Sequence, residues 1–185
     1  MKSKTTNPQQ YIELLEVFRI ALIHKIIDKQ VVISWADIII RSDTEPDYFI
    51  IELSLAGHNN DNEILTLLNT YIEEHKTLIS CRVILGLLYK QLFTQHIDLK
   101  KAVAVINWLI EERKLTEKDE RLFYRLDEHY ELAAANISGS MDAVREYTFG
   151  ALEMYSSFNI DNVEEWNEAN TKVGRLIDEF DSFLH

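Results

Sequence analysis

The chain has 185 residues, of which 31 are acidic and 19 basic, so its formal net charge at pH 7 is −12. Hydrophobic residues make up 46% and charged residues 27%, with only 5 glycines and 2 prolines, which excludes a disordered chain and favours a helical globular one. The single cysteine, Cys81, excludes an intramolecular disulfide, and its apolar neighbours predict a buried thiol in a reducing cytoplasm.

The acidic charge is concentrated toward the C-terminal end. Residues 141–185 contain ten acidic and three basic residues, whereas residues 1–30 contain three acidic and five basic ones. Nucleic acids and anionic membranes attract basic surfaces, so neither is an expected partner. No apolar run approaches the roughly 20 residues of a membrane span, and no signal-peptide pattern begins the chain. We therefore expect a cytoplasmic protein whose acidic end either suits a basic protein partner or serves only as a solvated surface.

The first predicted helix begins at Asn7 and Pro8 and ends near Lys29, after a flexible tail formed by residues 1–7. Residues 31–33 are interpreted as an apolar connector to the next helix. The apolar positions of the first helix recur at intervals of three and four residues, which is the period of one helix face. They are Tyr11, Leu14, Leu15, Phe18, Leu22 and Ile26.

Residues 34–57 are predicted to form two short helices around a proline turn. Ser34 and Thr44 are each followed three residues later by an aspartate, the spacing of a capping box. Pro46 stands early in the second helix, and Gly57 is a suitable helix terminator. The apolar residues exceed what one helix face requires, so we expect this hairpin at the centre of the fold. They are Trp35, Ile38, Ile39, Ile40, Tyr48, Phe49, Ile50, Ile51, Leu53 and Leu55.

The rest of the chain is predicted to continue as helices. The expected first residues or caps are Asn60, Thr77, Asp98, Thr116 and Asp161. The helix after Thr116 is expected to continue through Ala135, followed by a loop over 136–140 and two helices at 141–158 and 162–183. The sequence thus predicts an all-α fold, with residues 1–185 forming a single compact domain of eight or nine helices packed as successive antiparallel hairpins, because the connections are short.

The densest polar cluster lies after Thr116 and is assigned to one helix. It consists of Asp119, Glu120, Arg121, Arg125, Asp127, Glu128, His129, Tyr130 and Glu131. No glutamate is followed three residues later by histidine, and H-E-x-x-H, Walker, dinucleotide and G-x-S-x-G motifs are absent from the sequence. We therefore expect a solvated helix face, with no catalytic residue, cofactor or metal. A metal-dependent enzyme using residues 127–131 is the least favoured of three hypotheses.

Aromatic residues near the C-terminal end lie among acidic ones, as expected of a surface that binds a basic protein. Charge raises the encounter rate, and buried rings supply much of the affinity. The candidate partner-binding residues are Glu146, Tyr147, Glu153, Tyr155, Asp161, Glu164, Glu165 and Glu168.

Residues 31–55, VVISWADIIIRSDTEPDYFIIELSL, resemble segments of small acidic helical proteins encoded beside bacterial polymorphic toxins, including immunity proteins of contact-dependent growth inhibition. The similar features are Trp35-Ala36-Asp37, the Glu45-Pro46 turn and the stretch Ile51-Glu52-Leu53-Ser54. The resemblance implies a non-catalytic protein that binds and blocks a cognate toxin domain, often a nuclease. It transfers no specific residue, because immunity interfaces differ between cognate pairs. The alternative is a helical scaffold or adaptor without a toxin partner.

Overall fold

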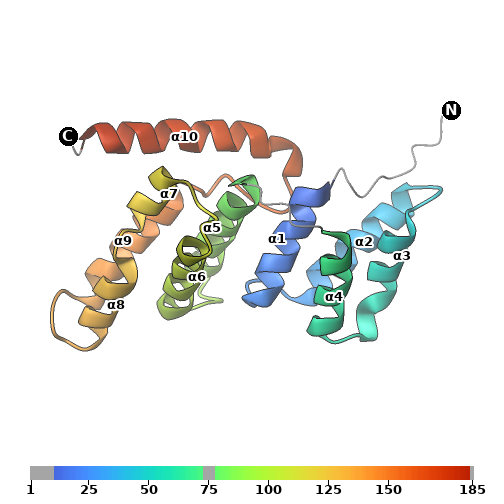
Figure 1. Ribbon diagram of the computed structural model, residues 1–185, viewed down its shortest axis with the longest axis horizontal. Helices are drawn as coiled ribbons and strands as arrows, with labels where there is room; N and C mark the ends of the chain where they lie inside the picture. Colours follow the sequence, from blue (N-terminus) through green and yellow to red (C-terminus); the bar gives the residue numbers. More distant parts are fainter. Residues whose placement is uncertain (1–10, 73–77, 184–185) are drawn as a thin grey trace. The chain divides into compact units, whose positions relative to one another are not determined.

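The computed structural model describes residues 11–72 and 78–183. Every regular element in these two ranges is a helix and none is a strand, which confirms the predicted all-α class (Figure 1). The predicted helix starts at Asn7 and Thr77 and the tail over 1–7 lie outside the described residues. Among the described helices, none has the length and apolar character needed to cross a membrane.

The contacts of the chain divide it into two compact units, residues 1–76 and residues 77–185. The first contains α1 (Ile12–Ile23), α2 (Lys29–Ser42), α3 (Tyr48–Leu55), the 3₁₀-helix η2 (Ala56–His58) and α4 (Asp61–Tyr71). The second contains α5 (Leu78–Phe93), α6 (Leu99–Glu111), α7 (Glu117–Leu122), α8 (Leu126–Ala134), α9 (Met141–Glu153), the 3₁₀-helix η3 (Val163–Glu165) and α10 (Trp166–Phe183).

In the first unit, α2 packs on α3 and α1 packs on α4. The prediction that Ser34 begins a helix is wrong, because α2 begins at Lys29 and is capped by Asp28, whose carboxylate accepts a hydrogen bond from the Gln30 amide at 2.7 Å. The expected connector at 31–33 is part of α2. The Asp37 carboxylate therefore caps nothing and accepts a hydrogen bond from the Ser54 hydroxyl on α3.

Of the two other caps predicted in the first unit, the one at Thr44 is wrong and the one at Asn60 is confirmed. Asp47, rather than Thr44, caps α3, so Pro46 precedes this helix instead of lying within it. Asn60 and Glu63 form the predicted capping box of α4, with N···O distances of 3.1 and 2.9 Å. Three apolar residues of the predicted hairpin are exposed, so its apolar excess is not all core. They are Ile38, Tyr48 and Leu55.

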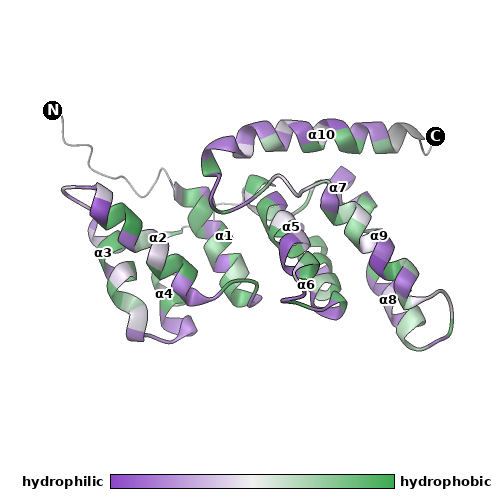
Figure 2. Cartoon of the chain, turned by 180° about the vertical axis from the view of Figure 1, so that it is seen from behind, coloured by the Kyte–Doolittle hydropathy of each residue, from purple (hydrophilic) through white to green (hydrophobic). Residues whose placement is uncertain are grey.

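The second unit is built from two helical hairpins, α5 with α6 and α8 with α9, which pack with α6 against α8 and α5 against α9. Figure 1 shows α10 running crosswise to these helices, and it packs on α5. In Figure 2, hydrophobic and hydrophilic residues alternate along α10, as expected of a helix with one buried stripe. That stripe consists of Trp166, Ala169, Val173 and Ile177.

Gly86 lets α5 approach the segment that follows α9. A Cβ atom at this position would lie 2.6 Å from the backbone oxygen of Tyr155 and 2.8 Å from that of Phe158. Real Cβ atoms are not found this close to backbone, so only glycine fits here without a shift of one segment. Cys81, also on α5, is buried, as predicted.

The helix predicted from Thr116 through Ala135 is two helices, α7 and α8. Thr116 caps α7 as expected, but the chain turns at Arg125, whose φ is +57° and whose ψ is 22°. The predicted cap of the last helix is also wrong. The Asn162 side chain accepts a hydrogen bond from the Asn159 amide at 2.9 Å, and α10 begins only at Trp166.

Four helices end in the same backbone conformation, in which a residue other than glycine has a positive φ. Lys25, Gln95, Arg113 and Asn136 follow α1, α5, α6 and α8 with φ between +50° and +59°. Each donates its amide to the carbonyl three residues earlier, and the next residue donates to the carbonyl five residues before it. This pair of bonds is the Schellman motif, which satisfies the last carbonyls of a helix. After Lys25, Gln95 and Arg113, the N-cap of the next helix follows three residues later. These N-caps are Asp28, Asp98 and Thr116.

Candidate functional site

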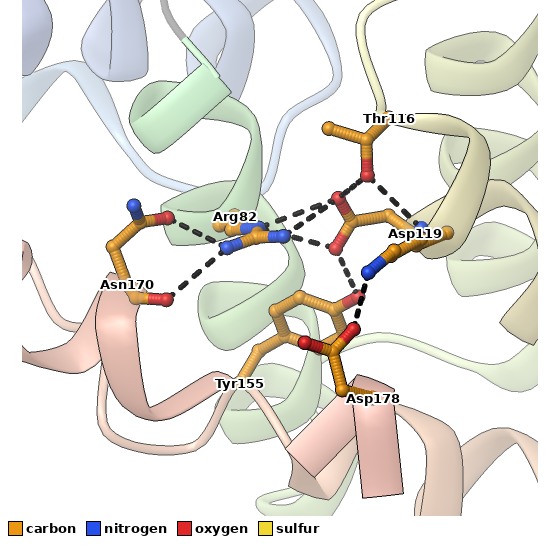
Figure 3. A network of polar contacts seen from close by, with 7 residues as sticks. Arg82, Thr116, Asp119, Tyr155, Asn170 and Asp178 are labelled. Atoms are coloured by element: carbon orange, nitrogen blue, oxygen red, sulfur yellow. Dashed lines mark hydrogen bonds and ion pairs between the residues drawn. The ribbon is translucent and has the colours of Figure 1, made fainter. Parts of the chain in front are cut away.

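A buried polar network joins α5, α7, α10 and the segment after α9 (Figure 3). Arg82 on α5 donates from Nε and Nη2 to the two carboxylate oxygens of Asp119, at 3.1 and 3.0 Å, and from Nη1 to Asn170 Oδ1 at 2.7 Å. The Thr116 hydroxyl and the Tyr155 hydroxyl, the latter at 2.7 Å, also donate to Asp119. Every polar atom of the carboxylate is therefore bound within the core.

This network corrects the prediction that Tyr155 contacts a partner. Its side chain is fully buried, and burial raises the pKa of its hydroxyl far above the ordinary value, with the Asp119 carboxylate adding to the effect. Phe158, the nearby ring of the same segment, is buried as well. We assign the network a structural role, because its charged groups are closed off from solvent and bound to one another.

The network continues to the surface through α7 and α10. Lys118, next to Asp119 in the sequence, forms an exposed ion pair with Asp178 of α10. Asp119 and Lys118 thus both connect α7 to neighbouring elements, one in the core and one in solvent.

The outer face of α9 carries the first group of predicted partner-binding residues. Glu146 and Glu153 are exposed and lie on opposite sides of Gly150, at helical spacings of four and three residues. Gly150 is itself exposed, and a Cβ atom there would contact nothing within 4 Å. The middle of this acidic stripe is therefore bare helix backbone.

Aromatic rings flank this face on both sides. Tyr147 is 45% exposed, and its hydroxyl donates to the Leu122 carbonyl at 2.6 Å, which holds the ring on the side of α7 and α8. Partial burial raises the pKa of this hydroxyl. On the other side, the half-buried Phe149 contacts Tyr89 of α5 edge to face at 6.3 Å, and Tyr89 stacks with the exposed Phe93 at 6.1 Å.

The second group of predicted residues surrounds η3 and the start of α10. Asp161, Glu164, Glu165 and Glu168 are all exposed, and residues 161–168 contain no basic side chain. Asn162 fixes this turn by donating from Nδ2 to the Ser157 carbonyl at 2.9 Å and to Glu165 at 3.1 Å. Farther along α10, exposed Lys172 and Arg175 interrupt the acidic surface.

A groove of about 400 Å³ lies between α8 and α9. Its lining is mostly apolar and includes two exposed tyrosines, Tyr124 and Tyr147. The full lining is Tyr124, Leu126, His129, Leu132, Ser138, Gly139, Ser140, Ala143, Val144 and Tyr147. A second surface depression of about 470 Å³, in the first unit, lies beside the exposed residues Tyr48 and Leu55 of α3.

The polar cluster of α8 does not assemble a metal site. Asp127, Glu128, His129 and Glu131 are exposed, and Glu128 pairs with Arg125, whose hydrogen bond holds the pKa of this carboxyl below its usual value. Among the residues that the structure describes, no group of three or more His, Cys, Asp or Glu side chains is arranged to hold a metal ion.

Sequence reasoning missed three aromatic residues of this surface, the exposed Tyr124 and Phe93 and the half-buried Phe149. Phe149 had a usable signal, because it lies three residues after Glu146 and four before Glu153 and so shares their helix face. Tyr124 had none, because its exposure depends on the turn at Arg125.

Comparisons with known protein families, curated proteins and solved structures found no match. The chain is therefore defined by its own features, as an all-α protein with an acidic, aromatic-flanked helix surface. The resemblance of residues 31–55 to immunity proteins stays a prediction.

Proposed function

We propose that this chain is a non-catalytic protein-binding protein that neutralises a cognate toxin domain through an acidic surface formed by α9 and the start of α10. The observation that carries the proposal is the outer face of α9, where Glu146 and Glu153 are exposed between the flanking rings of Tyr147 and Phe149. Rings provide contact area and carboxylates provide attraction to a basic cleft, such as the substrate cleft of a nuclease.

The charge of the surrounding surface supports a basic partner. Residues 161–168 add four exposed carboxylates without a basic side chain. Acidic side chains on the rim of an interface mainly accelerate association and make it sensitive to salt. The aromatic residues, rather than the carboxylates, then determine how slowly the complex dissociates.

The proposal is tested by capturing a partner from a lysate of the source cell with the tagged intact chain, then purifying the identified protein. We expect a protein with a positive net charge whose toxicity is relieved when this chain is co-expressed. Calorimetric titration at 50 and 300 mM NaCl should show weaker binding at the higher salt concentration.

Charge-reversal variants provide the matched comparison. Glu146→Lys combined with Glu153→Lys should weaken binding, whereas Glu45→Lys combined with Glu112→Lys, exposed changes of the same charge away from α8 and α9, should have a smaller effect. A partner that is neither basic nor toxic would instead support the scaffold hypothesis. Binding that ignores both salt and the α9 variants, together with variants at Glu164, Glu165 and Glu168, would exclude the proposed surface.

A further inference from the structure

The groove between α8 and α9 has the features of a socket for an apolar side chain. Its lining includes the apolar residues Leu126, Leu132 and Val144, and its volume of about 400 Å³ lies in the range of ~300–1,000 Å³ typical of sites for small ligands. Two tyrosines, one 71% and the other 45% exposed, form part of the lining. Partly exposed tyrosines at the edge of an apolar cavity are common in protein interfaces, because the ring packs against apolar side chains while the hydroxyl remains hydrated.

One edge of the groove depends on a strained residue. Arg125 has a left-handed backbone, which is unfavourable for a residue other than glycine because its Cβ crowds the following carbonyl oxygen. Unlike the other four such residues, it closes no Schellman motif and instead stands directly before α8. Its turn separates α7 from α8 and leaves Tyr124 exposed, and its exposed guanidinium pairs with Glu128.

The charge around the groove indicates the chemistry of its occupant. Residues 124–153, which include every lining residue of the groove, contain six acidic residues and two basic ones, Arg125 and Arg145. Three exposed acids directly precede lining residues: Glu131 before Leu132, Asp142 before Ala143, and Glu146 before Tyr147. An apolar socket bordered by carboxylates is complementary to an apolar side chain flanked by lysine or arginine.

We propose that the α8–α9 groove binds one apolar or aromatic side chain of a basic segment of the protein partner, with the flanking cations near Asp142 and Glu146. This inference rests on the proposed function and specifies where the partner is anchored. Glu146 and Tyr147 thus act together, one attracting the basic segment and the other forming the socket wall.

The test uses two synthetic peptides, Lys-Lys-Phe-Lys-Lys and Lys-Lys-Gly-Lys-Lys, titrated into the ¹⁵N-labelled intact chain and followed by amide chemical shifts. The phenylalanine peptide should shift the amides of Leu132, Ala143 and Tyr147. The glycine peptide carries the same charge without the ring, so it should shift these amides much less. Equal effects of the two peptides, or shifts confined to other helices, would overturn the socket.

A groove-filling variant provides the control for simple charge attraction. Ala143 is exposed, so Ala143→Leu fills the groove without disturbing the core, and it should weaken binding of the phenylalanine peptide by about tenfold. Ala104→Leu places the same side chain on the exposed face of α6 and should leave the affinity unchanged. Equal affinities of both variants for this peptide would contradict the proposal.

The captured partner separates this inference from the proposed function. If the partner binds and its affinity falls with the α9 charge reversals but is unchanged by Ala143→Leu, the groove assignment fails while the proposed function stands. If no basic partner is captured although the phenylalanine peptide binds the groove, the proposed function fails, while the assignment of the groove as a binding site for an apolar side chain is supported.

Discussion

Arg82 of α5 and Asp119 of α7 form a two-point ion pair in which the exposed fraction of the side chain is 7% for the arginine and 0% for the aspartate. Bidentate pairing of this kind fixes direction as well as distance. Because Arg82 also holds Asn170, a single guanidinium orients both α7 and α10 relative to α5. The pair therefore helps to fix α10, whose start carries part of the candidate surface, against α5.

Removing one partner of this pair should strongly destabilise the protein. Asp119→Ala leaves a buried guanidinium without its carboxylate, and loss of one member of a buried pair costs about 3–5 kcal/mol. The measurement is the free energy of unfolding from urea titration. The double variant Arg82→Met with Asp119→Leu should recover much of the loss, because it removes both charges. Equal losses in the single and double variants would show that the pair itself is not responsible.

Tyr155→Phe should change how stability depends on pH. The pKa of Tyr155 is raised in the folded state, whereas the unfolded tyrosine ionises near pH 10, so its contribution is complete below about pH 10 and is lost as pH rises further. The lost contribution grows by up to about 1.4 kcal/mol per pH unit. The phenylalanine variant lacks this term but also lacks the hydrogen bond to Asp119, so it should be less stable at pH 7 by about 1–3 kcal/mol.

Unfolding free energies of both proteins, measured by urea titration between pH 7 and pH 11, provide the check. The difference between them should shrink above pH 10. A constant difference over the whole range would mean that Tyr155 ionises as easily in the folded protein as in the unfolded chain.

The all-α class could be predicted because apolar periodicity and side-chain caps are local signals. Asn60, Asp98 and Thr116 cap helices as expected, since each is followed by a helical pattern and accepts a hydrogen bond from the amide three residues later. Helix ends were harder to predict. Lys25 and Arg113 end helices in a left-handed conformation usually associated with glycine, so the residue type gives no stop signal.

The candidate site was predictable in part for the same reason. Exposure of Glu146 and Glu153 follows from their position opposite the buried stripe of α9, which local spacing reveals. Burial of Tyr155 does not follow from its neighbours in sequence, because it depends on Asp119, which lies 36 residues away. The groove lay beyond prediction as well, since it requires both the turn at Arg125 and the packing of α8 on α9.

Gly86→Ala and Gly150→Ala should change stability in opposite directions. At Gly86 the added Cβ would approach two backbone oxygens to under 3 Å, so α5 or the segment after α9 must shift, and the unfolding free energy should fall by more than about 1 kcal/mol. At Gly150 the added methyl meets open space, and replacing glycine inside a helix should raise stability by about 0.5–1 kcal/mol. Thermal unfolding followed by circular dichroism measures both. Similar effects of the two changes would contradict the close approach at Gly86.

The Schellman motif after α5 predicts that a glycine substitution stabilises the protein at Gln95 and destabilises it at Gln91. Gln95 has φ +59°, so Gln95→Gly relieves the steric clash of its Cβ in the folded protein. Glycine also increases the entropy of the unfolded chain, which offsets part of this effect, so the free energy of unfolding should rise by about 0.5–1 kcal/mol. Gln91 lies within α5, four residues earlier, where the same substitution should lose about 1 kcal/mol. Urea titration of both variants gives the two differences. A loss at both positions would show that the chain does not hold Gln95 in the left-handed conformation in solution.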